Sequence, residues 1–120
     1  MTKVMIVDDA AFMRLTVRTM LEKHGYQVVG EAENGSAALR KYIECKPDLV
    51  TKDITMPEMN GIEALAALKK LDPKATVVMI TAMGQADMVK EAVLKGAATF
   101  IVKPFQEEHL IQTLQKITGN

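Results

Sequence analysis

Short apolar runs alternate with longer segments of helical periodicity along the whole chain. The runs are rich in Val, Ile and Met, and the segment after the first run repeats apolar residues at helical spacing, from Met13 through Val17 to Leu21. The pattern predicts five strands, at Lys3–Val7, Tyr26–Glu31, Asp48–Asp53, Ala75–Thr81 and Ala97–Val102. It also predicts five helices, at Ala11–His24, Ser36–Cys45, Ile62–Leu71, Ala86–Lys95 and Glu107–Ile117.

The repeated order of strand and helix favours an α/β fold. Strands such as "VVMI" (77–80) are apolar at every position, as expected for a parallel sheet that helices cover on both faces. Because crossovers are right-handed, few topologies remain, and we expect a doubly wound, flavodoxin-like (βα)5 sheet with strand order 2-1-3-4-5. The chain has 120 residues, which fits a single domain over residues 1–120.

Polar side chains follow four of the five predicted strands at the point where each strand ends. Asp8 and Asp9 come directly after the first strand, and Asp53 ends the third. Thr81 ends the fourth strand, and Lys103 follows the fifth. In an open parallel sheet, ligands bind outside the carboxyl ends of the strands, where the strand order reverses. The sequence therefore predicts a polar site at this edge, with its three carboxylates on the first and third strands.

The residue types at this edge indicate phosphoryl chemistry. Three clustered carboxylates repel one another unless a cation joins them, and oxygen ligands of this kind suit Mg²⁺. A lysine and a threonine hydroxyl beside the metal can bind phosphoryl oxygens, and a carboxylate can attack phosphorus to form an acyl phosphate. Each feature alone is also typical of an ordinary turn or helix start, so the prediction depends on their joint occurrence.

Overall charge and composition exclude several classes of partner. Fifteen basic and fifteen acidic residues cancel, which argues against nucleic acid or an anionic membrane held by bulk charge. No apolar stretch approaches the length of a membrane span, and the N-terminal apolar run is too short for a signal peptide. The single cysteine, Cys45, fits a reducing compartment, so we expect a cytoplasmic protein.

Four segments, "MIVDDAAFMR", "DITMPEMNG", "ITAMGQ" and "FIVKPF", resemble the receiver domain of bacterial response regulators. Their order and spacing agree over essentially the whole chain, and "DDAAFMR" and "AMGQ" are most similar to the stand-alone chemotaxis regulators. The resemblance implies that Asp53 is the phosphoacceptor and that Asp8 and Asp9 form an acidic pocket with it. It implies that Asp9 and Asp53 bind Mg²⁺ directly, with Asp8 acting through bound water.

The resemblance assigns roles to further residues. It implies that the backbone carbonyl of Thr55 completes the metal ligands, and that Thr81 and Lys103 contact the phosphoryl group. It implies a cis peptide bond between Lys103 and Pro104. Phe100 matches the aromatic switch position, so that on phosphorylation Thr81 moves toward the phosphoryl group and Phe100 turns inward to fill the vacated space.

The resemblance also implies partners and a cycle. A chemotaxis histidine kinase donates the phosphoryl group, the switched state binds the flagellar motor switch protein, and hydrolysis, unaided or helped by a phosphatase, resets a monomeric protein. The domain would phosphorylate and dephosphorylate itself rather than act on a separate substrate. Thr55 and Met83 follow Asp53 and Thr81 by two residues, and we expect them to tune hydrolysis, although simple packing by Met83 is an equal alternative.

Lys52 departs from the apolar pattern of its strand. Strand alternation points its side chain away from that of Asp53. Because a buried ammonium is costly, we expect Lys52 to extend to the surface along its aliphatic stem. A second interpretation, in which Lys52 is a cation that weakens Mg²⁺ binding, stays open.

Three other identities compete with a stand-alone chemotaxis regulator. The chain could be the receiver fragment of another response regulator. A phosphatase of the haloacid dehalogenase type also uses Asp, Thr, Lys and Mg²⁺, but it needs an Asp-x-Asp motif after the first strand and a longer chain. A flavin-binding module needs a phosphate-binding first loop, and the acidic "DDAAF" would repel a phosphate.

Overall fold

Strands and helices alternate throughout the described part of the chain, which comprises residues 1–54, 61–82 and 86–119 of a computed structural model. The strands are β1 (Lys3–Val7), β2 (Gln27–Ala32), β3 (Leu49–Asp53), β4 (Val77–Ala82) and β5 (Thr99–Lys103). The helices are α1 (Ala11–Lys23), α2 (Gly35–Cys45), α3 (Gly61–Leu71), α4 (Ala86–Leu94) and α5 (Glu107–Thr118). All ladders are parallel and the strand order is β2-β1-β3-β4-β5, which confirms the predicted topology.

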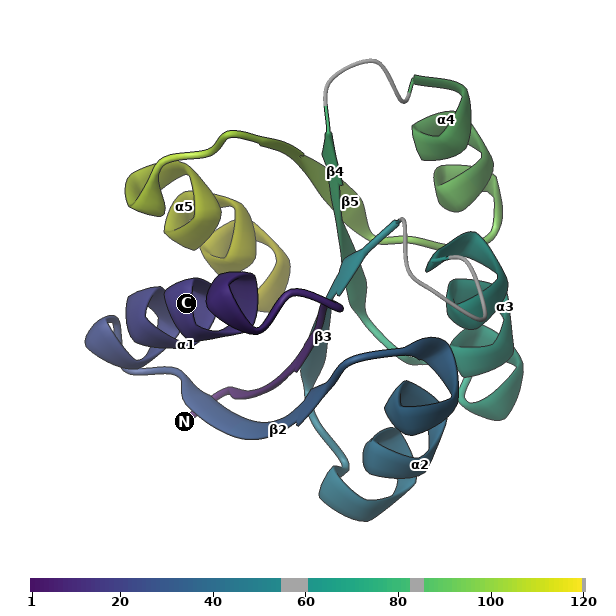
Figure 1. Ribbon diagram of the computed structural model, residues 1–120, viewed down its shortest axis with the longest axis horizontal. Helices are drawn as coiled ribbons and strands as arrows, with labels where there is room; N and C mark the ends of the chain where they lie inside the picture. Colours follow the sequence, from purple (N-terminus) through teal and green to yellow (C-terminus); the bar gives the residue numbers. More distant parts are fainter. Residues whose placement is uncertain (55–60, 83–85, 120) are drawn as a thin grey trace.

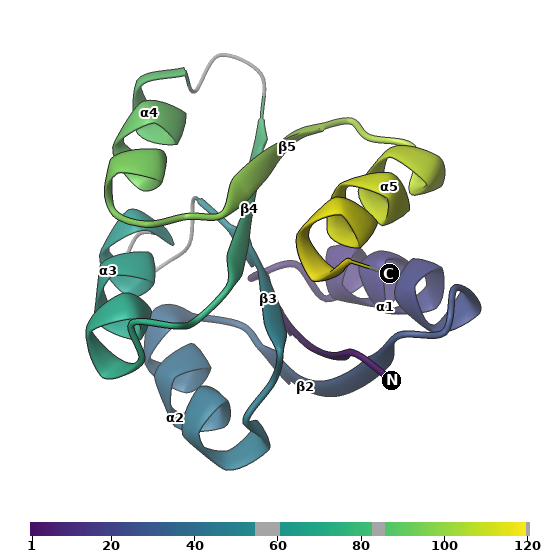
Figure 2. The same ribbon diagram turned by 180° about the vertical axis from the view of Figure 1, so that it is seen from behind.

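Helices cover both faces of the sheet. In Figure 1, α1 and α5 lie to the left of the strands, and α2, α3 and α4 lie to the right; Figure 2 shows the same layers from behind. Each face has its own apolar core, and successive strand residues alternate between them. Val4 and Leu49 pack toward α1 and α5, whereas Met5 and Val50 pack toward α2 and α3. This double burial explains why the inner strands β1 and β4 are apolar at nearly every position.

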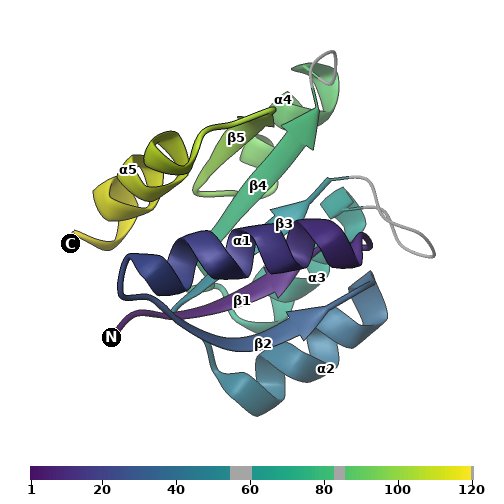
Figure 3. The ribbon, with the colours of Figure 1, turned by 60° about the vertical axis from the view of Figure 1, so that its left-hand side comes forward.

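The carboxyl ends of the strands meet at one edge of the sheet. Figure 3 shows the arrowheads of β1, β2 and β4 pointing the same way, and the ladders pair Val7 with Lys52 and Asp53 with Ile80. The residues that follow β1 and end β3 and β5 therefore share this edge. No helix of the described residues is both long and apolar enough to span a membrane.

Candidate functional site

Three carboxylates gather at the carboxyl ends of β1 and β3, which are neighbours in the sheet. Because Val7 pairs with Lys52, the next residues along the two strands, Asp8 and Asp53, lie side by side. Asp8, Asp9 and Asp53 each place one carboxylate oxygen so that all three lie within 4.8 Å of one another. Sequence reasoning expected this juxtaposition from strand order, and the structure brings the three residues together.

Asp8 is the most enclosed of the three acids, with 3% of its surface exposed. Its carboxylate accepts a hydrogen bond of 2.9 Å from the backbone N–H of Ala10. Burial raises the pKa of Asp8; the Ala10 hydrogen bond and Lys103 lower it, while Asp53 and Asp9 raise it further. Burial and like charge outweigh the local donors, so the ionised cluster favours a cation.

Lys103 brings one positive charge to the cluster from the edge strand β5. Its Nζ lies 3.6 Å from Asp53 Oδ2 and 3.8 Å from Asp8 Oδ2. At these distances the ammonium attracts both carboxylates without a short hydrogen bond to either. The peptide bond between Lys103 and Pro104 is cis, as the resemblance implied.

Thr81 and Phe100 occupy related positions on β4 and β5. Thr81 is 1% exposed and lies one residue beyond the β4 partner of Asp53. Its hydroxyl donates to the carbonyl oxygen of Ala82 at 3.2 Å. Phe100 lies two residues before the β5 partner of Thr81, and its side chain is 42% exposed. The structure therefore shows Phe100 in an outward arrangement.

The expectation that Lys52 reaches the surface is wrong. Its side chain is fully buried, and its two partners across the ladders, Val7 and Met79, belong to the core that α2 and α3 cover. Burial lowers the pKa of Lys52 to about 8, although the negative charge of Asp53 opposes the shift. The lysine stem is enclosed because every residue of β3 is buried and the neighbouring side chains on this face belong to the apolar core.

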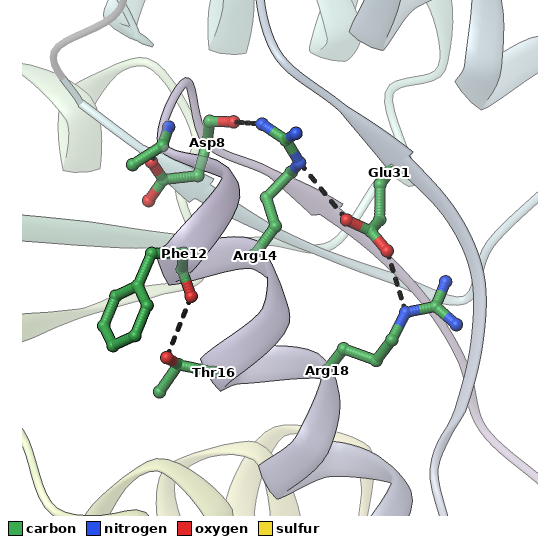
Figure 4. A network of polar contacts seen from close by, with 7 residues as sticks. Asp8, Phe12, Arg14, Thr16, Arg18 and Glu31 are labelled. Carbon is green, nitrogen blue, oxygen red and sulfur yellow. Dashed lines mark hydrogen bonds and ion pairs between the residues drawn. The ribbon is translucent and has the colours of Figure 1, made fainter.

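A hydrogen-bonded network behind the acids was not anticipated from the sequence. Figure 4 shows Arg14 between Asp8 and Glu31, with Arg18 on the other side of Glu31. Arg14 Nη1 donates to the carbonyl oxygen of Asp8 at 2.7 Å, and its Nε donates to Glu31 at 3.2 Å. The signal available in the sequence was the position of Arg14 within "DDAAFMR".

The remaining site residues from the sequence analysis, Thr55 and Met83, lie outside the described residues. Among the described residues, the donor set fits Mg²⁺. Asp8, Asp9 and Asp53 offer hard carboxylate oxygens, which are the ligands that Mg²⁺ takes from proteins. The pKa of Asp8 is raised first by burial and then by the charges of Asp53 and Asp9, and a divalent cation would offset the cost of the ionised carboxylates.

Comparison with known proteins identifies the family. The sequence model of the response regulator receiver domain matches residues 4–115. The chain belongs to this family. Phosphorylation and Mg²⁺-dependent switching are general for receiver domains, and the acidic cluster at the edge of this sheet lies within the matched range.

This receiver domain is closely related to the CheY chemotaxis response regulators. It is 53% identical to chemotaxis protein CheY of Thermotoga maritima over 116 residues, which cover 97% of each chain. It is 53% identical to CheY of Bacillus subtilis over 114 residues, or 95% of each chain. A solved CheX-CheY-BeF3-Mg²⁺ complex from Borrelia burgdorferi matches with a TM-score of 0.93 and 36% identity, over 98% of this chain and 89% of the other. The matches to the receiver family cover nearly the whole chain, and they do not support the flavin-binding or haloacid-dehalogenase alternatives.

Proposed function

We propose that this receiver domain accepts a phosphoryl group on Asp53 from the phosphohistidine of a chemotaxis histidine kinase. The observation that carries the proposal is the gathering of three carboxylate oxygens within 4.8 Å, with Lys103 Nζ 3.6 Å from Asp53. Asp8 and Asp9 follow β1, whereas Asp53 ends the central strand β3 and lies nearer to Lys103 than Asp8 does. Asp53 is therefore the carboxylate that we assign as nucleophile.

The transfer needs one bond made and one broken. A carboxylate oxygen of Asp53 bonds to phosphorus while the bond from phosphorus to the histidine nitrogen breaks, and the electron pair stays on the imidazole. Water later breaks the new O–P bond and releases inorganic phosphate. Lys103 neutralises negative charge on the phosphoryl oxygens throughout.

The metal-binding roles follow the donor set. Asp9 and Asp53 would hold Mg²⁺ directly and Asp8 would act through bound water, together with the carbonyl of Thr55, which lies outside the described residues. Bound Mg²⁺ supplies positive charge that offsets the carboxylates and the phosphoryl oxygens. Because Asp8 is nearly enclosed and already accepts the Ala10 N–H, its carboxylate has the least freedom to become a direct ligand.

The output is a shift between two arrangements of β4 and β5. Thr81 turns its hydroxyl from the Ala82 carbonyl toward the phosphoryl group, and Phe100 leaves its outward position. We propose that the switched form binds the flagellar motor switch protein as a monomer in the cytoplasm, with a phosphatase speeding its reset. The family relationship to chemotaxis proteins supports this assignment, and Met83, outside the described residues, is proposed to tune hydrolysis.

The test is the intact mass of the full chain after incubation with Mg²⁺ and a small acyl phosphate. Wild type is expected to gain one phosphate, and Asp53→Asn none. Asp48→Asn is the matched control. Asp48 lies just before the amino end of the same strand, away from the site at its carboxyl end, and its carboxylate accepts the Lys3 N–H at 2.8 Å. Phosphate on Asp53→Asn, or none on wild type, would overturn the assignment. Addition of EDTA before the donor should prevent labelling.

A further inference from the structure

The carboxylate of Asp9 has no side-chain anchor among the described residues. Asp9 is exposed, and it makes no hydrogen bond or ion pair with them, whereas the neighbouring Asp8 accepts the Ala10 N–H. The position of the Asp9 carboxylate therefore depends on the position of the backbone at Asp9. That backbone is the peptide unit linking Asp8 to Asp9.

This peptide unit is held at its carbonyl oxygen, and the preceding peptide unit is held at its N–H. The N–H of Asp8 donates to the carbonyl oxygen of Ala32 in β2 at 3.0 Å, which fixes the chain as it enters Asp8. The carbonyl oxygen of Asp8 accepts from Arg14 Nη1 at 2.7 Å, a short charge-assisted bond. Because a peptide unit is planar, fixing the carbonyl of Asp8 also fixes the nitrogen and Cα of Asp9.

Arg14 is itself oriented by Glu31 on β2. The Nε of Arg14 lies 3.2 Å from Glu31 Oε1, and the side chains of Arg14 and Glu31 are 17% and 30% exposed. The second oxygen of Glu31 accepts from Arg18 Nε at 2.8 Å. Figure 4 shows this order, with Arg14 reaching the Asp8 carbonyl and Arg18 turned away from it. Arg18 thus shares the acid but does not touch the site.

We propose that Arg14 and Glu31 are positioning residues for the metal site of this receiver domain. Glu31 orients the guanidinium of Arg14, and Arg14 holds the Asp8–Asp9 peptide so that both carboxylates point to one ion shared with Asp53. The inference rests on the proposed function, since it concerns the same Mg²⁺ site. It adds residues that neither ligate the ion nor touch the phosphoryl group.

The sign of the effect separates positioning from simple electrostatics. Arg14 is a cation beside a cation-binding cluster, so its charge alone disfavours Mg²⁺, and its removal should tighten binding. If Arg14 positions the ligands, its removal weakens Mg²⁺ binding instead. Residues that hydrogen-bond the ligands of a metal site typically contribute about 10- to 100-fold to metal affinity. The two roles therefore predict opposite changes in the dissociation constant.

The experiment is calorimetric titration of the full chain with MgCl2. The dissociation constant is expected to rise about tenfold in Arg14→Met and by a smaller factor, about threefold, in Glu31→Gln. Arg14→Lys keeps the charge but not the planar fork, and it is expected to fall between wild type and Arg14→Met. Arg18→Met is the matched control, with a constant within about twofold of wild type, because Arg18 bonds the same Glu31 without reaching Asp8.

A double variant tests whether Glu31 acts through Arg14. Arg14→Met/Glu31→Gln is expected to bind Mg²⁺ as weakly as Arg14→Met alone, and additive losses would contradict the proposed order. Each variant is checked for folding by circular dichroism in EDTA. If Arg14→Met does not fold, Arg14→Lys decides the question, and an unchanged or tighter constant in the folded variant overturns the inference. Absence of Mg²⁺ binding in wild type would overturn the proposed function instead.

Discussion

Lys52 and Asp53 are consecutive residues of β3 whose side chains lie on opposite faces of the sheet, and both are buried. Asp53 faces the acidic cluster and Lys103, whereas Lys52 is enclosed beside Val7 and Met79. One strand end thus carries a buried acid and a buried base on separate sides. The acid belongs to the site, and the base imposes a folding cost that can be measured.

Replacing Lys52 with Met is expected to stabilise the protein. The pKa of Lys52 falls from 10.5 to about 8 on folding, so the unfolded state binds more protons between these values. The penalty is full below pH 8, and at pH 7 its removal should raise the free energy of unfolding by about 3 kcal/mol. The gain should shrink as pH rises from 8 to 10.5. Urea unfolding at pH 7 and pH 10 measures both effects.

Lys41→Met, at an exposed position of α2, is the control for the charge change and should alter stability little. A loss of stability in Lys52→Met at neutral pH would show that the ammonium contributes to the fold. The same variant tests the interpretation that Lys52 weakens metal binding, because that role requires a clearly tighter Mg²⁺ affinity.

Asp8→Asn is expected to raise the melting temperature of the metal-free protein. The pKa of Asp8 is raised by burial, so its favourable contribution exists below the unfolded pKa of 3.8 and is lost as pH rises. At neutral pH the ionised carboxylate therefore destabilises the fold, and its neutralisation should add on the order of 4 °C. Added Mg²⁺ should stabilise wild type more than the variant. Thermal melting in EDTA and in Mg²⁺ measures both, and a lower melting point for Asp8→Asn in EDTA would contradict the account.

Tyr42 should titrate well above an ordinary tyrosine. Its hydroxyl donates to Asp72 Oδ2 at 2.8 Å, and burial, followed by this hydrogen bond and the charge of Asp72, raises its pKa to about 12. The raised pKa means that its contribution to stability is complete below pH 10 and is lost as pH rises through about 12. In Tyr26→Phe, where Tyr42 is the remaining tyrosine, tyrosinate absorbance should develop near pH 12. Half-titration near pH 10 would show that the buried, hydrogen-bonded arrangement of Tyr42 with Asp72 is absent in solution.

Phe100→Trp should report the proposed switch, because the chain contains no tryptophan. The 42% exposure of Phe100 predicts long-wavelength emission from the indole in the resting protein. Beryllium trifluoride with Mg²⁺, as a phosphoryl mimic, should move the emission to shorter wavelength as the ring turns inward. Asp53→Asn/Phe100→Trp should show no shift. If the mimic raises the melting temperature but leaves the emission unchanged, the mimic binds without moving residue 100, and the proposed switch is contradicted.

Most of the fold could be predicted from the sequence, because apolar periodicity marks buried strands and helix faces directly. Most predicted bounds differ from the structure by no more than one residue, and the largest errors, of two residues, are at the beginnings of β4 and β5. Ala75 and Ala97 continue the apolar pattern, but the Ala75 N–H closes a turn onto Asp72 and the Ala97 N–H closes the end of α4 onto Ala92. Local backbone hydrogen bonds outweigh the small apolar gain of an alanine in a strand, so β4 and β5 begin two residues later than expected.

The acids and Lys103 could be predicted because strand ends of a parallel sheet must meet. Pairing between side chains that are far apart in the sequence could not be predicted, because no local spacing of residues indicates it. Arg14 and Glu31 are 17 residues apart, and His24 and Glu107, which lie 3.0 Å apart, are separated by 83. Lys52 shows the same limit: alternation gave its face correctly, but only the packed helices show how completely that face is covered.

The placement of Lys103 on the edge strand has a mechanical consequence. β5 bonds to β4 alone, whereas β3 bonds to both β1 and β4. A displacement of β5 therefore strains one ladder, and a displacement of β3 would strain two. The strand that contributes the lysine to the site also carries Phe100 on its exposed surface. The edge strand β5 is therefore easier to displace than the central strand β3. A small movement of Lys103 can shift β5 and so reach exposed Phe100, while the inner strands keep their positions.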